Sequence, residues 1–316
     1  MHIKKGSKIL ILRFSSIGDI ILTTPVIRCL KQQTEAEIHY LTKSKFSELL
    51  ADHPQIDKLW TFERDWTEIK TALLTEKFDL IIDLHKNIRS YHISWVLGVK
   101  TLRFDKLNFR KWLAVVSKYN CLPKKHIVDR YFDALKTCGI LNDGRGLDCF
   151  FHAQDLANFK LPDKYVVGVL GATYFTKQIP AQKWKELIEK TNLPMVLLGG
   201  TNERLLAEEL LSKFPNQITN LCGHTTLRQS AAVIQSCEYL VTPDTGMMHI
   251  GAALKKSMHV YWGNTIPEFG MYPYYGDQQL PWYSHEVKNL SCRPCSKLGY
   301  AACPKGHFRC MMEQEV

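Results

Sequence analysis

The chain has 316 residues and an ordinary globular composition, with 45% hydrophobic and 23% charged residues. These proportions exclude disordered, collagen-like and coiled-coil proteins, and the length predicts about two domains. Lys and Arg outnumber Asp and Glu by 41 to 31, which gives a formal charge of +10 and favours an acidic partner.

Short β-rich runs alternate with helix-length polar and apolar stretches along the first half of the chain. Predicted strands cover residues 8–14, 37–42, 58–62, 78–84 and 101–104. A helix is predicted over residues 25–33, where Thr24 can cap the helix and Pro25 suits its first position. Strands that alternate with helices in this way are typical of a parallel sheet covered by helices.

The pattern breaks at residues 141–164, where Leu-Asn-Asp-Gly-Arg-Gly and later Leu-Pro-Asp-Lys indicate a domain boundary. It then restarts, with predicted strands at 165–170, 195–198, 218–221, 239–241 and 258–262. Predicted helices cover 183–190, 203–213, 227–236 and 247–254. We therefore predict an α/β protein with two doubly wound domains that face a cleft, residues 1–160 and 161–285, followed by a basic Cys-rich tail, residues 286–316.

One carboxylate stands out in the first half. Ligands of such sheets bind beyond the carboxyl ends of the strands, so the loops after the strands are the places to inspect. After the first strand, Ser15-Ser16-Ile17-Gly18-Asp19 forms a strand-to-helix turn that places Asp19 at the mouth of the sheet. Asp19 is a candidate for chemistry, although Asp also caps helices in this position.

Three loops of the second half suit an anion or a sugar. Thr242-Pro243-Asp244-Thr245-Gly246 runs into a helix start whose free N–H groups can hold a phosphate, with an ordinary capped helix as the alternative. Lys177, in a Gly- and Thr-containing loop, suits a transferring phosphate, and Glu203, after Gly199-Gly200, suits a ribose diol. Taken alone, Lys177 could be a solvated surface residue and Glu203 a helix-start acid. Neither a P-loop nor a Gly-x-Gly-x-x-Gly fingerprint occurs.

The positive charge is concentrated in two segments. Residues 86–130 hold eleven basic and two acidic residues with aromatics interleaved, and residues 288–309 hold five basic residues and no acid. Such a surface suits a polyanion or a membrane interface. The alternative is that these Lys and Arg residues solvate helices whose aromatics face the core. We see no helix-turn-helix, RNA-binding or zinc-finger motif, so an acidic substrate or an anionic lipid is favoured over nucleic acid.

Taken together, these motifs resemble the ADP-heptose:lipopolysaccharide heptosyltransferases, glycosyltransferase family nine. The resemblance runs from Lys8 to about Pro273. Its anchors are Ser15–Asp19 with Thr23-Thr24-Pro25, Thr176-Lys177, Gly199-Gly200 with Glu203, and Asp244-Thr245-Gly246 with His249. Any one of these motifs is weak, but four of them in the family's order are specific.

The resemblance implies a GT-B fold with two Rossmann-like domains, and an inverting transfer that requires no metal or other cofactor for catalysis. By resemblance, Asp19 is the general base and Lys177 stabilises the departing diphosphate. The donor-binding residues implied in this way are Thr176, Lys177, Glu203, Asp244, Thr245, Gly246 and His249. The acceptor-binding residues expected are Ser16, Gly18, Thr23, Lys86 and Arg89.

The tail departs from this family pattern. Cys292, Cys295, Cys303 and Cys310 follow the spacing C-x2-C-x7-C-x6-C, with His307 between the last two. Four thiolates this close in sequence can bind one structural zinc. Because the later two cysteines form no second tight pair, free thiols or a disulfide remain the alternatives.

The expected partners are ADP-heptose as donor and a lipopolysaccharide core or lipid A precursor as acceptor, with no nucleic acid. No apolar run is long enough to span a membrane, and the first residues enter a strand pattern rather than a secretory signal. We therefore expect a cytoplasmic enzyme that associates transiently with the inner leaflet of the inner membrane. Two other functions fit the same residues: a GT-B transferase or epimerase that uses another sugar nucleotide, and a non-catalytic, zinc-containing protein that binds nucleic acid.

Overall fold

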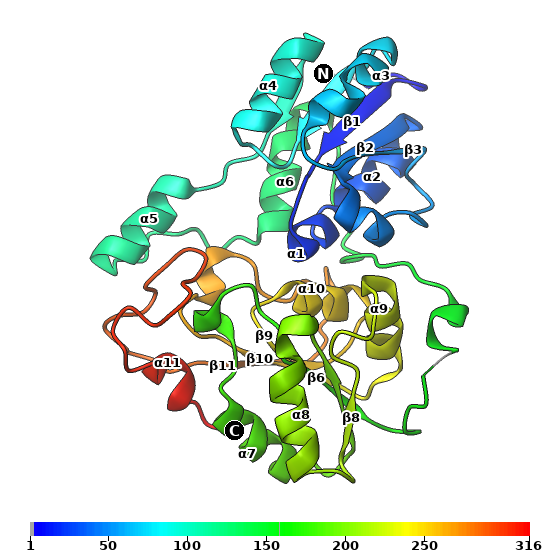
Figure 1. The fold of residues 1–316 in the computed structure, drawn as a ribbon. Coiled ribbons are helices and arrows are strands. Elements are labelled where there is room, and N and C mark those ends of the chain that lie inside the picture. The colour runs from blue at the N-terminus through cyan, green and yellow to red at the C-terminus, as the bar shows by residue number, and fades with distance from the viewer. Residues whose placement is uncertain (1–2, 158) are drawn as a thin grey trace. The chain divides into compact units, whose positions relative to one another are not determined.

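The structure, a computed structural model, describes residues 3–157 and 159–316 and divides into two compact units (Figure 1). Unit 1 comprises Met1–Lys106, Lys125–Phe150 and Gly276–Gln278. Unit 2 comprises Leu107–Lys124, Phe151–Tyr275 and Gln279–Val316. The predicted first domain, residues 1–160, includes residues 107–124, whereas these lie with unit 2 in the structure.

Unit 1 contains a five-stranded parallel sheet in the order β3-β2-β1-β4-β5. The strands are β1 (Lys8–Leu12), β2 (Glu37–Lys43), β3 (Lys58–Phe62), β4 (Leu80–Asp83) and β5 (Thr101–Arg103). The helices are α1 (Ile17–Ile21), α2 (Thr24–Thr34), α3 (Lys70–Thr75), α4 (Ile88–Leu97) and α6 (Ile127–Leu135). The sheet order turns back at β1, so the loops after β1 and β4 are neighbours at one end of the sheet.

Unit 2 contains a six-stranded parallel sheet in the order β11-β10-β9-β6-β7-β8. The strands are β6 (Val166–Val169), β7 (Met195–Leu198), β8 (Ile218–Asn220), β9 (Leu240–Pro243), β10 (Met258–Tyr261) and β11 (Trp282–His285). The helices are α5 (Asn108–Ser117), α7 (Ala181–Lys190), α8 (Arg204–Lys213), α9 (Leu227–Ser236), α10 (Gly246–Ala253) and α11 (Arg309–Met312). The switch in strand order lies between β6 and β9. The segments after these two strands carry all the predicted donor residues except Glu203, which follows β7.

The central strands are apolar along their whole length because helices cover both faces of a parallel sheet. In β1, Ile9 to Leu12 are all fully buried, and β6 and β7 are buried throughout. The bulkiest fully buried side chains are Trp66 in unit 1 and Trp184 and Trp262 in unit 2. These buried runs hold the strand ends, and with them the functional loops, in fixed positions.

The strands predicted from the sequence are confirmed, and the helix predicted over residues 25–33 is α2. Strand β11 was not predicted, because its Trp-Tyr-Ser-His sequence is short and largely polar. Within the described residues, no helix is long and apolar enough to cross a bilayer.

Candidate active site

Asp19 lies in the short helix α1, at the end of the turn that follows β1. Its Oδ2 accepts hydrogen bonds from the Ser16 hydroxyl at 2.8 Å and from the Ser16 N–H at 3.2 Å. Its Oδ1 forms an ion pair with the Arg13 guanidinium at 2.5 Å. The side chain is still 20% exposed, so a ligand can reach the carboxylate.

The surroundings of Asp19 keep it ionised. Burial opposes ionisation, but the charge of Arg13 and the hydrogen bonds from Ser16 outweigh burial and hold the pKa of Asp19 below its usual value. The folded state therefore gains stability from this group above its unfolded pKa and loses it as the pH falls through the lower folded pKa. At neutral pH Asp19 is therefore a carboxylate, and its oxygens can accept a hydrogen bond from a hydroxyl group.

Arg13 is a site residue that the sequence analysis missed. It is nearly buried, and besides Asp19 it donates to the carbonyl oxygens of Ser15, at 2.8 Å, and Leu84. Leu84 follows β4, so Arg13 ties together the loops at the ends of two neighbouring strands. A charged residue directly after the buried run of β1 is the signal that could have revealed it.

The turn after β4 is organised by Asp83, which is fully buried. Its Oδ1 accepts from the N–H groups of His85 and Lys86, and its Oδ2 accepts from Ser90 and Arg103. Of the two predicted acceptor residues here, Lys86 donates to the Phe104 carbonyl oxygen at 3.0 Å. Arg89, the other one, has its Nε 3.7 Å from a carboxylate oxygen of Asp65 and stays partly exposed.

Two further titratable side chains lie within the electrostatic reach of Asp19. Burial, together with the charges of Arg13 and Lys106, lowers the pKa of His85 to about 3, so this imidazole is neutral at physiological pH. Burial and the charge of Arg13 also lower the pKa of Lys106. Asp19 therefore has a positively charged setting, which suits an anionic ligand.

The other predicted acceptor residues take different positions around Asp19. Ser16 is exposed and bonds to Asp19, while Gly18 is buried within α1. Thr23 is fully buried, and its hydroxyl donates to the Ile20 carbonyl oxygen and lies 2.9 Å from the Tyr40 hydroxyl. The Thr23 side chain thus braces the turn between α1 and α2.

In unit 2, Lys177 and Asp244 come together at the ends of β6 and β9. The Lys177 Nζ lies 2.6 Å from the Asp244 Oδ2, which also accepts from the Thr265 hydroxyl at 2.8 Å. Burial opposes ionisation of Asp244, but Lys177 and Thr265, with a smaller effect of His249, hold its pKa below the usual value. Thr265, in the loop after β10, was missed; inspection of every loop after a strand could have found it.

Thr176 connects the Lys177 loop with the tail through hydrogen bonds to Tyr300. Its buried hydroxyl accepts from the Tyr300 N–H at 2.9 Å, and its own N–H donates to the Tyr300 carbonyl oxygen at 3.2 Å. A Cβ at Gly263 would lie 2.2 Å from the Thr176 carbonyl oxygen, so the close approach of the next loop requires glycine there. Thr176 therefore positions Lys177 through packing and backbone bonds.

The Glu203 carboxylate sits over a glycine-lined loop. Its Oε2 accepts from the Gly200 N–H at 2.7 Å, and a Cβ at Gly171 would lie 3.3 Å from the same oxygen. A Cβ at Gly199 would approach the Cβ of Glu203 to 2.9 Å. Because the three glycines have no side chains, there is space for this half-exposed carboxylate.

Helix α10 begins at Gly246, directly after the loop that holds Asp244. Thr245 is its N-cap residue, with extended backbone, and its hydroxyl lies 3.4 Å from that of Thr242. The N–H groups of a first helical turn have no partners within the helix and attract anions. His249 is buried one turn further along α10. Asp244 thus pairs with Lys177 and lies two residues before the positive end of α10.

Possible metal ligands gather elsewhere in the described residues. Three that lie within 4.8 Å of one another are Glu37, His39 and Glu76. Both ring nitrogens of His39 are engaged, with Glu37 and with Trp60, and Glu76 pairs with two lysines. These side chains are already engaged in hydrogen bonds and ion pairs with protein partners, so they are not free to bind a metal ion. The four tail cysteines carry free thiols that are more widely spaced.

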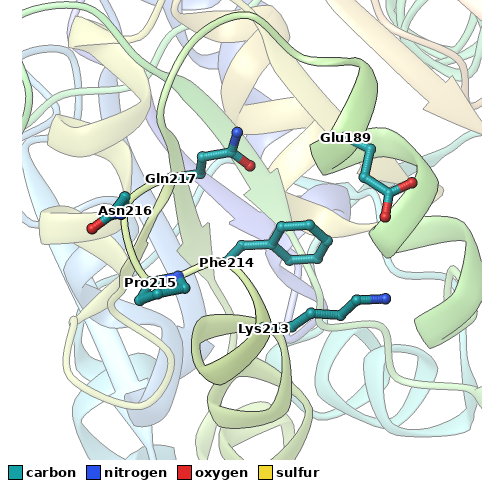
Figure 2. Close-up of a pocket in the computed structure, with 6 residues that line it drawn as sticks. All are labelled: Glu189, Lys213, Phe214, Pro215, Asn216 and Gln217. Carbon is teal, nitrogen blue, oxygen red and sulfur yellow. The ribbon is translucent and has the colours of Figure 1, made fainter.

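A hollow of about 370 Å³ lies in unit 2 (Figure 2). It is lined by Glu189, Lys213, Phe214, Pro215, Asn216 and Gln217. The Gln217 carbonyl oxygen accepts from the N–H of Met195, at the start of β7. The hollow is therefore at the amino ends of the strands, opposite to the end where ligands of such sheets bind.

Most of the chain is similar to known glycosyltransferases. The model of glycosyltransferase family 9 (heptosyltransferase) matches residues 66–300. Lipopolysaccharide heptosyltransferase 1 of Pseudomonas aeruginosa is 26% identical over 320 residues, with 92% of this chain and 86% of the relative covered.

Solved structures of heptosyltransferases share the fold of this chain. Escherichia coli ADP-heptose LPS heptosyltransferase II superposes with a TM-score of 0.70 and 19% identity, and covers 93% of this chain and 92% of that one. The dodecameric iron-containing heptosyltransferase TibC gives a TM-score of 0.59 and 12% identity, with 98% and 73% covered. The predicted fold class, α/β with two Rossmann-like domains of the GT-B type, is confirmed.

Proposed function

Because the chain belongs to glycosyltransferase family 9, we propose that it transfers heptose from ADP-heptose to the inner core of lipopolysaccharide. The observation that carries the proposal is Asp19, a carboxylate held ionised at a strand end yet partly open to solvent. A base of this kind is what the activation of a sugar hydroxyl requires.

We infer the following roles in unit 1. The acceptor hydroxyl gives its proton to the Asp19 carboxylate, and its oxygen attacks the anomeric carbon of the heptose while the bond to ADP breaks, with inversion. Arg13 holds Oδ1, and Ser16 holds Oδ2, which fixes the direction of the carboxylate. Lys86 and Arg89 supply positive charge for the phosphates of the acceptor core.

The donor residues of the proposal lie in unit 2. Lys177 neutralises the charge that develops on the departing ADP, and the N–H groups at the start of α10 bind the diphosphate. Asp244 and Thr265 keep Lys177 in place, and Thr176 ties its loop to the tail. Glu203 accepts hydrogen bonds from the ribose hydroxyls.

Turnover and nucleotide selectivity test this function. We expect the chain to release ADP when it is given ADP-heptose and a truncated lipopolysaccharide core, and a panel of cores identifies the accepting sugar. ADP should raise the melting temperature more than UDP, GDP or a DNA oligomer does. A shift with UDP alone would favour another sugar nucleotide, and a shift with DNA but no nucleotide would favour the nucleic-acid-binding alternative.

We also propose that the chain acts in the cytoplasm, transiently attached to the inner leaflet of the inner membrane. The support is chemical: the proposed acceptor is carried by a lipid, and residues 86–130 bear eleven basic residues against two acids. No metal or other cofactor is assigned a catalytic role in this proposal.

For the tail we propose one structural zinc held by Cys292, Cys295, Cys303 and Cys310. The donor set fits, because four thiols within 19 residues lie in one segment and His307 reaches 3.8 Å from the Cys292 sulfur. Burial, then the neighbouring tail thiols, raise the pKa of Cys310 to about 12, so a metal would be needed to hold it as a thiolate. Binding would draw the sulfur atoms closer together.

Metal content tests the tail site. The purified, reduced protein should contain about one equivalent of metal, and the Cys295→Ser variant should lose it and melt about 5 °C lower or more. Cys138→Ser, a partly buried cysteine outside the tail, is the matched control and should keep the metal. Elemental analysis also distinguishes zinc from iron, which the similar TibC contains. Metal-free protein with an unchanged melting temperature would reject the site.

A further inference from the structure

Helix α5 of unit 2 exposes an apolar stripe to solvent. Phe109, Trp112 and Val116 are 71%, 49% and 60% exposed. Their spacing of three and four residues places them on one face of the helix. The Phe109 and Trp112 rings stack, with centroids 5.9 Å apart. Such a face costs free energy in water, so it indicates a contact with an apolar partner.

The segment that carries this stripe is purely cationic. Residues 107–124 contain Arg110, Lys111, Lys118 and Lys124 and no acidic residue. Arg110 and Lys124 are exposed. A helix with aromatic residues on one face and Lys or Arg beside them is the composition of helices that lie in the interface of a membrane.

The stripe is held in a defined place by the tail of the same unit. Lys118 Nζ donates to the Pro294 carbonyl oxygen at 2.7 Å and to that of Cys292 at 3.3 Å, and Lys111 lies 5.7 Å from the centre of the Phe269 ring. Figure 1 shows α5 beside the loop of the tail, drawn in orange to red. The tail adds exposed Lys297 and Lys305, so the basic character continues from α5 into the tail.

The charge distinguishes between two possible occupants of this face. A second copy of the chain packed on the same stripe would bring its cations next to those of the first, which disfavours association. An anionic bilayer accepts the aromatic side chains between its headgroups and pairs its phosphates with the cations. Charge complementarity therefore favours the bilayer.

We propose that α5 is the membrane-docking element of the chain, with Phe109, Trp112 and Val116 inserted at the headgroup level of an anionic bilayer. This inference rests on the proposed function, because it places the enzyme on the surface that carries its lipid-borne acceptor. The proposal assigns membrane attachment to one helix. In this proposal, the contacts between Lys118 and the tail hold that helix in place on unit 2.

Vesicle flotation tests this assignment without any transfer reaction. The wild-type chain should bind vesicles of phosphatidylcholine with phosphatidylglycerol and bind phosphatidylcholine alone weakly. The double variant Phe109→Ser, Trp112→Ser should bind the anionic vesicles on the order of tenfold more weakly. Leu205→Ser is the matched control, since Leu205 of α8 is 81% exposed in the same unit, and its vesicle binding should equal that of the wild type.

Helix α4 of unit 1 is the main alternative membrane-docking element, because Ile88 and Trp95 are also highly exposed. Loss of vesicle binding in Ile88→Ser, Trp95→Ser with retention in the α5 double variant would overturn the assignment. So would light scattering that shows a wild-type dimer, a monomeric α5 variant and no vesicle binding by either. The α5 variant should keep the ADP-induced thermal shift and turnover on a deacylated, soluble acceptor. Failure of those two readouts in the wild type would instead count against the proposed function.

Discussion

Replacement of Asp19 by Asn should lower kcat by about 10²- to 10⁴-fold, the usual contribution of a general base. The substitution keeps the size of the side chain but removes the group that takes the acceptor proton. ADP affinity should stay within about twofold, because Asp19 is assigned to the acceptor and not to the nucleotide. The measurements are steady-state release of ADP and calorimetric titration with ADP.

A matched carboxylate serves as control for this variant. Asp133 of unit 1 also forms ion pairs, with Lys125 and Lys136, yet it belongs to no proposed site, and Asp133→Asn should retain wild-type turnover. Wild-type turnover in Asp19→Asn itself would falsify the assigned role.

The pH profile gives an independent readout of the same residue. Because the pKa of Asp19 is held below its usual value near 3.8, the acid limb that it contributes to kcat/KM should lie below that pH. Ser16→Ala removes the 2.8 Å hydrogen bond to Oδ2, so the pKa and the acid limb should both move upward. An acid limb that stays in place would indicate that another group controls the profile.

Replacement of Lys177 by Met should lower kcat on the order of 10²- to 10³-fold, the effect of removing one charge-stabilising donor at a leaving group. It should also weaken ADP binding, since Lys177 is assigned to the diphosphate. Loss of the cation leaves the Asp244 carboxylate with the Thr265 hydroxyl and without its ion pair, and should cost about 3 kcal/mol of stability.

A double variant separates these two effects of Lys177. In Lys177→Met, Asp244→Asn no uncompensated carboxylate remains, so chemical denaturation should show most of the stability restored while turnover stays low. Lys183→Met is the control, because Lys183 also forms an ion pair in unit 2, with Glu186, but lies on α7 and is assigned no role in donor binding. Full recovery of turnover in the double variant would mean that Lys177 acts only through folding.

The alternation of apolar and amphipathic runs in the sequence was sufficient to predict the parallel sheets. Strands such as β1 and β7 are buried on both faces, and each shows this in its sequence as four consecutive apolar residues. The candidate site residues could also be predicted from local sequence, because the loop after each parallel strand lies at the edge of the sheet where ligands bind. Asp19, Lys177, Glu203 and Asp244 all stand in such loops, and their order along the chain carries the family resemblance.

Only the tertiary structure decided which of these side chains are partners. Lys177 meets Asp244 across 67 positions of sequence, and Thr265 joins them from a third loop. Arg13 was overlooked because its contacts with Asp19 and with the Leu84 carbonyl oxygen depend on the adjacency of β1 and β4. Thr23, which the resemblance assigns to the acceptor site, is fully buried, and its hydroxyl lies 2.9 Å from the Tyr40 hydroxyl, a contact that only the fold reveals.

The same contrast holds for the excess of positive charge in the chain. Composition and position determined that the charge is clustered, and that aromatic residues accompany it. Whether those aromatics face a core or solvent depends on the neighbours of the helix, which periodicity alone does not specify. In the folded chain α5 lies with unit 2, where Lys118 binds the tail and Phe109 and Trp112 remain exposed. Long-range packing, and not the local sequence pattern, therefore decides that the aromatic side chains of α5 are exposed to solvent.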